Sequence, residues 1–320
     1  MQLIVWGIFI LIILGLLVLD LGVLNKNQHE VKTKEALTWT AVWVSLALLF
    51  NVVVYYAYQY NIMDVVTNSP DIKNGKDAVL KFFTGYLIEE SLSMDNVFVI
   101  AMLFSYFNIP AKYQHRVLFW GIMGALVFRG LMIVLGTALV HQFAWIMYIF
   151  GGLLVFSALK MLFGGDSEFD ADKNFAVKAI RKFYPVSKEL DGGNFFTVKD
   201  GIKMATPLFV ILIVIETTDI IFAVDSIPAI FAVTTDPFIV FTSNVFAILG
   251  LRSLYFVLAS FMNKFAYLKY SLVVLLLFIG IKMLIVDFVH LSIPLSLGII
   301  VVILGVGVIA SLILTKEKSK

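Results

Sequence analysis

Apolar runs of about 20 residues, separated by short polar stretches, occupy most of the chain. A run of this length is what an α-helix needs to cross the hydrocarbon core of a bilayer. The pattern therefore predicts an all-α transmembrane fold of nine spanning helices. The predicted spans lie at 3–24, 38–60, 79–107, 117–140, 143–163, 204–234, 238–262, 267–288 and 292–314.

Composition supports the membrane interpretation. Of the 320 residues, 61% are hydrophobic and only 14% are charged, whereas soluble domains carry about 25% charged residues. The absence of cysteine excludes disulfides, thiolate metal sites and a cysteine nucleophile within this sequence. A net charge of +2 gives no reason to expect a nucleic-acid partner. The first apolar run is too long for a signal peptide, so we expect it to remain as the first span.

Lysine and arginine mark alternate connecting segments. They concentrate after the first, third and seventh spans, in the long segment 164–203 and in the tail. The loops around His141, Asp236 and His290 carry none. Because positively charged loops stay on the cytoplasmic side, this alternation places the N-terminus outside and the C-terminus in the cytoplasm.

The second half of the chain repeats the first, and the two copies are inverted. Spans three to five begin outside the cell, whereas spans six to eight begin inside. Inverted three-helix repeats are typical of secondary transporters, whose binding sites lie near the midplane. The matching elements are Glu89-x5-Asp95-Asn96 with Asp219-x5-Asp225-Ser226, Arg129 with Arg252, and 159–162 with 281–284.

These features divide the chain into five segments. We expect a short amphipathic helix near Phe175 to Phe183 in the central, cytoplasmic one. The segments are two N-terminal spans (1–78), the first repeat (79–163), a cytoplasmic linker (164–203), the second, inverted repeat (204–288), and the last span with a basic tail (289–320).

Six acidic residues lie inside two of the predicted spans. A carboxylate at the centre of a span costs about 2.5–3.5 kcal/mol, so such residues face a cavity or a partner. One interpretation is that they only neutralise Arg129 and Arg252 as structural ion pairs. Six acids against two arginines leave an excess of negative charge, which favours a cation site. The acids are Glu89, Glu90 and Asp95 in the third span and Glu216, Asp219 and Asp225 in the sixth.

Helix geometry limits which of these acids can meet. Residues six apart point about 120° away from each other, so Glu89 and Asp95 cannot share one face of a straight helix. Residues seven apart nearly coincide, which pairs Glu89 with Asn96 and Asp219 with Ser226. Gathering both acids of one span therefore requires a broken helix or ligands from both repeats.

A break in the sixth span would also expose backbone oxygens. Pro228 has no N–H, so the carbonyl of Val224 loses its helical partner, as in many midplane cation sites. None of the four histidines lies inside a span, and hard oxygen donors suit manganese, calcium or magnesium better than zinc or copper. The predicted metal ligands are Glu89, Asp95, Asn96, Glu216, Asp219, Asp225 and Ser226.

Other polar residues are expected around this site. Arg129 and Arg252 are predicted to act as counter-ions or gates. Asp20, near the cytoplasmic end of the first span, either lines the pathway or reaches the membrane interface. Glu90 has Ile220 as its counterpart in the second repeat, so we expect no symmetric role for it.

The segments GYLIEESLSMDN (85–96) and ETTDIIFAVDSIPA (216–229) closely resemble motifs of the TerC family, and the chain looks like its Alx-type members. The family is grouped with inverted-repeat cation transporters of the LysE type. Its members are implicated in manganese export and in supplying metal to exported proteins. The resemblance implies manganese efflux across a bacterial inner (plasma) membrane. The positions that match the motifs are Glu89, Asp95, Asn96, Asp219, Asp225 and Ser226.

The leading hypothesis is a secondary transporter, not an enzyme, that exports manganese by alternating access without a permanently bound cofactor. Its expected partners are the divalent ion and the lipid bilayer. Four motif carboxylates and two arginines leave two negative charges, enough for one divalent ion, and proton antiport follows if some acids exchange protons for metal. An intramembrane aspartyl protease is disfavoured because its Gly-x-Gly-Asp motif is absent. A membrane scaffold that supplies metal to exported proteins is the alternative.

Overall fold

The computed structural model describes residues 2–19, 33–62, 71–164, 175–187, 189–199, 201–261, 268–289 and 291–318. Within these residues the chain forms ten helices and one two-stranded sheet. The elements are α1 (Gln2–Leu19), α2 (Thr33–Gln59), α3 (Gly75–Tyr106), α4 (Ala111–Gln142), α5 (Ile146–Phe163), α6 (Phe175–Phe183), β1 (Phe196–Lys199), β2 (Ile202–Ala205), α7 (Pro207–Phe231), α8 (Pro237–Phe261), α9 (Leu268–Leu284) and α10 (Ile293–Lys318).

Each predicted span corresponds to one long helix, with its ends shifted by a few residues. Among the described residues, six helices are long and apolar enough to cross a membrane, namely α2, α4, α5, α7, α8 and α10. The remaining three fall short for different reasons. The described apolar stretch of α1 is short, α9 has 17 residues, and α3 carries Glu89, Glu90 and Asp95 around its middle. The fold is therefore helical and membrane-type, and the count of nine spans stays a prediction.

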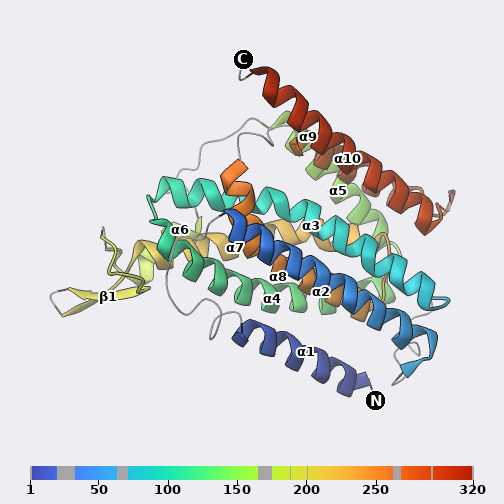
Figure 1. The fold of residues 1–320 in the computed structure, drawn as a ribbon, viewed down its shortest axis with the longest axis horizontal. Coiled ribbons are helices and arrows are strands. Elements are labelled where there is room, and N and C mark those ends of the chain that lie inside the picture. The colour runs from blue at the N-terminus through green and yellow to red at the C-terminus, as the bar shows by residue number, and fades with distance from the viewer. Residues whose placement is uncertain are drawn as a thin grey trace.

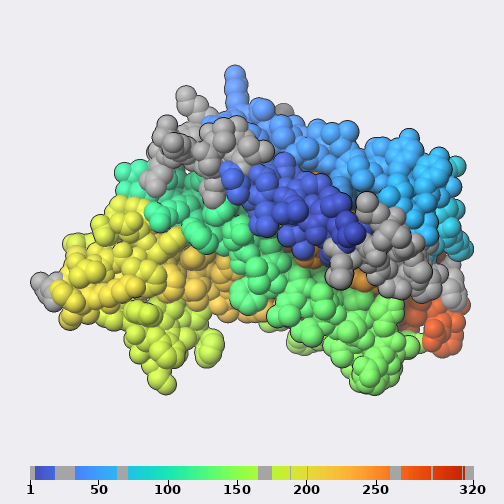
Figure 2. Space-filling view, turned by 90° about the horizontal axis from the view of Figure 1, so that it is seen from below, coloured from blue at the N-terminus to red at the C-terminus, as the bar shows by residue number. Residues whose placement is uncertain are grey.

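The long helices run along one common axis, and the two chain ends lie at opposite ends of the bundle (Figure 1). The helix α6 and the β1–β2 hairpin project beyond the long helices at one end. We call this the linker end. The space-filling view shows α1 on the outer face of the bundle (Figure 2). There Phe9 packs against Phe50 of α2 and Phe238 of α8, with ring centroids 5.4 and 5.9 Å apart.

Two helix pairs make the most extensive contacts in the bundle. α3 packs along α8, and α5 packs along α9. Small residues permit the close approach of α5 and α9, because a Cβ added at Gly151 would lie 3.0 Å from the carbonyl oxygen of Gly280. α2 packs against both α3 and α8, and α4 lies against α7.

The linker contains the predicted amphipathic helix, with the predicted bounds. α6 buries Ala176, Val177 and Ile180 against the bundle and exposes Phe175 and Phe183. The β1–β2 hairpin corrects the all-α prediction: its strands pair antiparallel, with Phe196 opposite Ala205. Because β2 extends to Ala205, the next helix begins at Pro207 and not at the predicted residue 204. Proline suits this first helical position, where its missing N–H is not needed.

A buried lysine organises the end of the bundle opposite the linker. Lys81 of α3 is 3% exposed, and its ammonium group lies 3.2 Å from Oδ2 of Asp71 and 3.5 Å from Oδ2 of Asp77. It also donates to the backbone carbonyl of Asp71. Asp71 Oδ2 accepts a second hydrogen bond, of 2.7 Å, from the hydroxyl of Thr234. The segment before α3 is thereby tied to the segment between α7 and α8.

Candidate ion-binding site

Arg129 of α4 forms the centre of a buried charged site. Its side chain is 2% exposed. One Nη atom pairs with the carboxylate of Glu89 from α3, while Nη2 and Nε donate to Asp219 of α7 at 2.8 and 3.2 Å. A planar guanidinium with five N–H groups is suited to hold two carboxylates in this way. The first acid of each motif therefore meets the other through one arginine.

Four further polar side chains complete this site. Arg129 Nη1 donates to Ser226 Oγ at 3.3 Å and to Asn244 Oδ1 at 3.2 Å. Asn96 Nδ2 donates to Asp219 Oδ1 at 3.4 Å, and Ser93 Oγ donates to Glu89 at 3.2 Å. All seven residues are buried. We call them the arginine cluster: Glu89, Ser93, Asn96, Arg129, Asp219, Ser226 and Asn244.

The helix periodicity explains the membership of this cluster. Residues seven apart share a face, and the predicted pairings of Glu89 with Asn96 and of Asp219 with Ser226 are both present around the guanidinium. The predicted break in the sixth span is wrong, since α7 continues as one helix through Pro228. The structure instead brings together one acid from each motif, Glu89 and Asp219, from two unbroken helices.

The second acids of the motifs lie outside the arginine cluster. Asp225 accepts a hydrogen bond of 2.6 Å from Ser157 of α5 and interacts electrostatically with Lys160. Asp95 interacts electrostatically with Lys269 at the start of α9. A separation of six residues turns each of these carboxylates about 120° away from the first acid. Asp225 therefore faces α5, and Asp95 faces α9.

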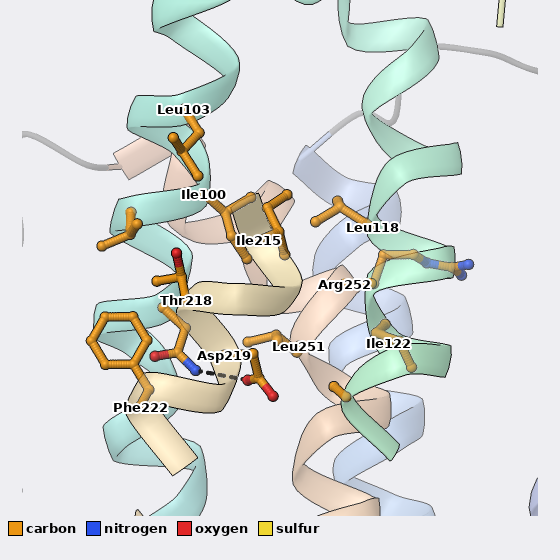
Figure 3. Close-up of a pocket in the computed structure, with 14 residues that line it drawn as sticks. Ile100, Leu103, Leu118, Ile122, Ile215, Thr218, Asp219, Phe222, Leu251 and Arg252 are labelled. Carbon is orange, nitrogen blue, oxygen red and sulfur yellow. Dashed lines mark hydrogen bonds between the residues drawn. The ribbon is translucent and has the colours of Figure 1, made fainter. Parts of the chain in front are cut away.

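A small cavity adjoins the arginine cluster on the side of the linker end (Figure 3). It has about 30 Å³ of free space, which is room for about one water molecule or a bare ion. Asn96, Thr218, Asp219 and Arg252 are its polar walls, and Ile100, Leu103, Leu118, Ile122, Ile215 and Leu251 are among its apolar ones. These residues lie in the second half of α3 and α8 and the first half of α4 and α7.

The remaining predicted residues have identifiable surroundings. Arg252 lies on the cavity wall and is 5% exposed. The carboxylate of Glu216 sits against Gly124 of α4, where any Cβ would overlap it. Glu90 lies near Gly250 of α8, at 3.9 Å from the position of an added Cβ. Asp20, a predicted pathway residue, lies outside the described residues.

In the part of the chain that the structure describes, no three histidine, aspartate or glutamate side chains gather as metal ligands. Arg129 instead lies between Glu89 and Asp219 and pairs with both. One guanidinium offsets one of their two negative charges. Two oxygens of the cluster have no hydrogen-bond partner, however: Glu89 Oε2 and Asn96 Oδ1.

Three residues of the site were not predicted from the sequence. Asn244 lies in the polar triplet 242–244, which interrupts an apolar run, and this interruption was a usable signal. Ser93 lies four residues after Glu89, one turn further along the same face. Ser157 is a lone serine in an apolar helix and gives no local signal of its contact with Asp225.

The apolar helices and the buried charged site define an integral, multi-pass membrane protein. Residues 74–319 match the family described as "Integral membrane protein TerC family", and the chain belongs to this family. The resemblance inferred from the two motifs is therefore confirmed.

Relatives from several bacteria match over nearly the whole chain. A Myxococcus xanthus protein named "Uncharacterized membrane protein STKORF319" is 47% identical over 312 residues, covering 98% of this chain and 93% of the relative. An Escherichia coli K12 protein named "Putative membrane-bound redox modulator Alx" is 48% identical over 296 residues, covering 92% and 90%. A Rickettsia bellii membrane protein is 41% identical over 308 residues, covering 96% and 97%. No solved structure matches the chain.

Proposed function

We propose that this protein is a secondary transporter that exports manganese across the bacterial inner membrane through the arginine cluster and the adjoining cavity. The observation that carries the proposal is the meeting of Glu89 and Asp219 at one buried point beside a cavity. Two carboxylates from different helices cost free energy to bury, and a structural ion pair alone does not require a neighbouring cavity.

Helix packing supports an inverted repeat. A two-fold relation between 79–163 and 204–288 exchanges α3 with α7 and α4 with α8. It therefore requires that α7 packs on α4 as α3 packs on α8, and both contacts are extensive. In this architecture the binding site lies at the interface of the repeats, which is where Arg129 joins α3 to α7.

Orientation follows from the charges of the linker end. Lys178, Arg181 and Lys182 of α6 are exposed there, so we assign this end to the cytoplasm, the C-terminus to the same side and the N-terminus to the outside. The cavity lies on the cytoplasmic side of Asp219 in this orientation. We propose that metal reaches the site through this cavity from inside the cell, as an exporter requires.

Ligand chemistry favours manganese as cargo. Every acceptor around Arg129 is a carboxylate, amide or hydroxyl oxygen, which suits hard divalent cations. The metal is a transported substrate and not a resident cofactor, and no enzymatic reaction is proposed. Exchange of protons for metal at the buried carboxylates would supply the driving force as antiport.

A scaffold that supplies metal to exported proteins is the second candidate. The name of the Escherichia coli relative refers to redox modulation. The present sequence contains no cysteine, so a thiol–disulfide couple is not available within it. Manganese movement is a route to a redox effect that needs no thiol. The cavity beside the buried acids favours transport over a purely structural role.

Flux measurements with purified protein in proteoliposomes test the proposal. We expect entry of Mn²⁺ into vesicles carrying an internal metal-sensitive dye, dependence on a pH gradient, and weaker signals for Zn²⁺. Asp219→Asn should abolish flux, whereas Asp191→Asn, at an exposed position of the linker, should not change it. Absence of flux from folded wild-type protein, or preference for Zn²⁺, would contradict the proposal.

A further inference from the structure

Resting on the transport function above, we propose that Arg129 is a tethered cation that occupies the metal position in this state. A divalent ion can bind between Glu89 and Asp219 only after the guanidinium has left them, and Arg129 returns when the metal departs. The metal and the arginine therefore compete for the same oxygens.

The contacts of the guanidinium carry this inference. It touches oxygens of Glu89, Asp219, Ser226 and Asn244, which come from three helices. Hard divalent cations require about six to eight oxygen ligands, so a metal in this part of the protein would need the same atoms. Arginine stays protonated in proteins, so it cannot yield the site by losing its charge and has to move.

Within the described part of the chain, two buried oxygens of the arginine cluster have no hydrogen-bond donor. Glu89 is fully buried, yet its Oε2 has no hydrogen-bond partner. Asn96 Oδ1 is also buried and without one. An unpaired buried acceptor costs about 1–3 kcal/mol, so a structure built only to hold an ion pair would satisfy both. They fit a site that has more ligands than the arginine uses.

The cavity lies on the side towards which the guanidinium can move, and because its free space of about 30 Å³ holds only about one water molecule, the swing must also displace side chains of the cavity wall. Arg129 shares one face of α4 with Ala125 and Gly121, four and eight residues earlier, and helical side chains lean towards the N-terminus of their helix. Both small residues line the cavity, together with Asn96. A swing of the arginine along this face would carry its N–H groups away from Glu89 and Asp219, towards Ala125 and Gly121, and open the space between the two acids.

This arrangement has a consequence for the empty transporter. When no metal is bound, two carboxylates face each other in a medium of low dielectric constant, where their repulsion is strong. The tethered guanidinium pairs with both carboxylates and offsets one of their two charges in that state. The empty protein can then change conformation without carrying two unpaired charges.

Binding of Mn²⁺ to purified full-length protein tests the competition. Calorimetry should be done on wild type, Arg129→Gln, Arg129→Lys and the exposed control Arg181→Gln. We expect Arg129→Gln to bind Mn²⁺ more tightly than wild type by roughly tenfold, a typical coupling between competing ligands, and to lose flux in vesicles. Arg129→Lys should show an intermediate affinity, because an ammonium group cannot span both acids, and Arg181→Gln should match wild type.

The outcomes separate this inference from the proposed function. Flux in wild type together with unchanged or weaker Mn²⁺ binding in Arg129→Gln would overturn the tethered cation and leave transport intact. Tighter binding in the variant with no flux in wild type would retain the competition and reject transport. If Arg129→Gln does not fold, the comparison is made with Arg129→Lys and with the double variant Glu89→Gln/Arg129→Gln, in which one acid and the arginine are both neutral. Arg129→Lys must then bind Mn²⁺ more tightly than wild type, and equal or weaker binding would overturn the inference.

Discussion

Gly151 and Gly152 are neighbours in α5 with opposite surroundings, so the same substitution at both tests the packing of α5 on α9. A Cβ at Gly151 would lie 3.0 Å from the carbonyl oxygen of Gly280, 3.0 Å from Met283 Cβ and 3.1 Å from Leu284 Cγ. A Cβ at Gly152 would have no atom within 4 Å. Optimal contacts between carbon atoms lie at about 3.5–4.0 Å, so only Gly151→Ala forces the two helices apart.

The expected difference follows from two terms. Replacing glycine by alanine in a helix interior gains about 1 kcal/mol, and this term is the same at both positions. Overpacking by an added group typically costs about 1–3 kcal/mol, and it applies at Gly151 alone. The free energy of unfolding of Gly151→Ala should therefore lie about 1–3 kcal/mol below that of Gly152→Ala.

Denaturant and thermal unfolding of the two variants in the same detergent measures this difference, with wild type alongside. Gly152→Ala should equal or exceed wild type in stability. If Gly151→Ala unfolds at the same denaturant concentration as Gly152→Ala, the close approach of α5 and α9 at Gly280 does not exist in the protein. The packing of α5 on α9 described above would then be wrong.

Three further predictions concern the charged groups. Lys81→Met should lower the free energy of unfolding by about 3 kcal/mol, the lower end of the usual cost of breaking a buried ion pair. The lower end applies because the acids that lose their partner, Asp71 and Asp77, are partly exposed. Lys76→Met, at an exposed position, should leave thermal unfolding unchanged. Gly124→Ala should leave stability nearly unchanged but reduce Mn²⁺ flux, since the flexible Glu216 side chain must move. Gly152→Ala, whose added Cβ has no atom within 4 Å and lies away from the cavity, should keep flux. Asp225→Asn should accumulate normally, because this acid is not a partner of the buried arginine, and loss of flux would then identify it as a second transport residue.

Much of the bundle could be predicted because lipid imposes a simple rule. Every span must satisfy its backbone hydrogen bonds internally, so apolar runs of sufficient length become helices. The bounds of α6 also followed from its alternation of apolar and basic residues. The β1–β2 hairpin was missed, although Asp200-Gly201 is a typical two-residue turn between strands and Gly201 has a φ of +76°. The length of apolar runs, which identifies membrane spans, does not detect a short turn between two strands.

The sequence predicts which residues of the site share one face of a helix. It does not predict which residues of different helices meet, because tertiary packing determines those contacts. Periodicity alone placed Glu89 with Asn96 and Asp219 with Ser226. It could not show which arginine would bridge the two acidic motifs, since Arg129 and Arg252 follow them at similar distances in the sequence. The proline was also misleading. Pro228 lies three residues before the end of α7, and the helix continues past it because a missing N–H there costs a single hydrogen bond.

The excess of acidic residues inside the spans is a weaker argument for an ion site than the sequence suggests. Four of the six acids have a cationic neighbour: Glu89 and Asp219 share Arg129, Asp225 lies near Lys160, and Asp95 near Lys269. Each pairing offsets part of the cost of burial, so charge counting alone would permit a purely structural network.

This site differs from a purely structural network because it has polar atoms without hydrogen-bond partners next to a cavity, among the residues that the structure describes. A structural ion pair is stable in proportion to how completely its polar atoms are bonded. Here a fully buried carboxylate leaves one oxygen unpaired, the adjacent amide oxygen is unpaired too, and a cavity adjoins that amide. Atoms held in this way are costly unless another state of the protein uses them, and a bound divalent cation would use both.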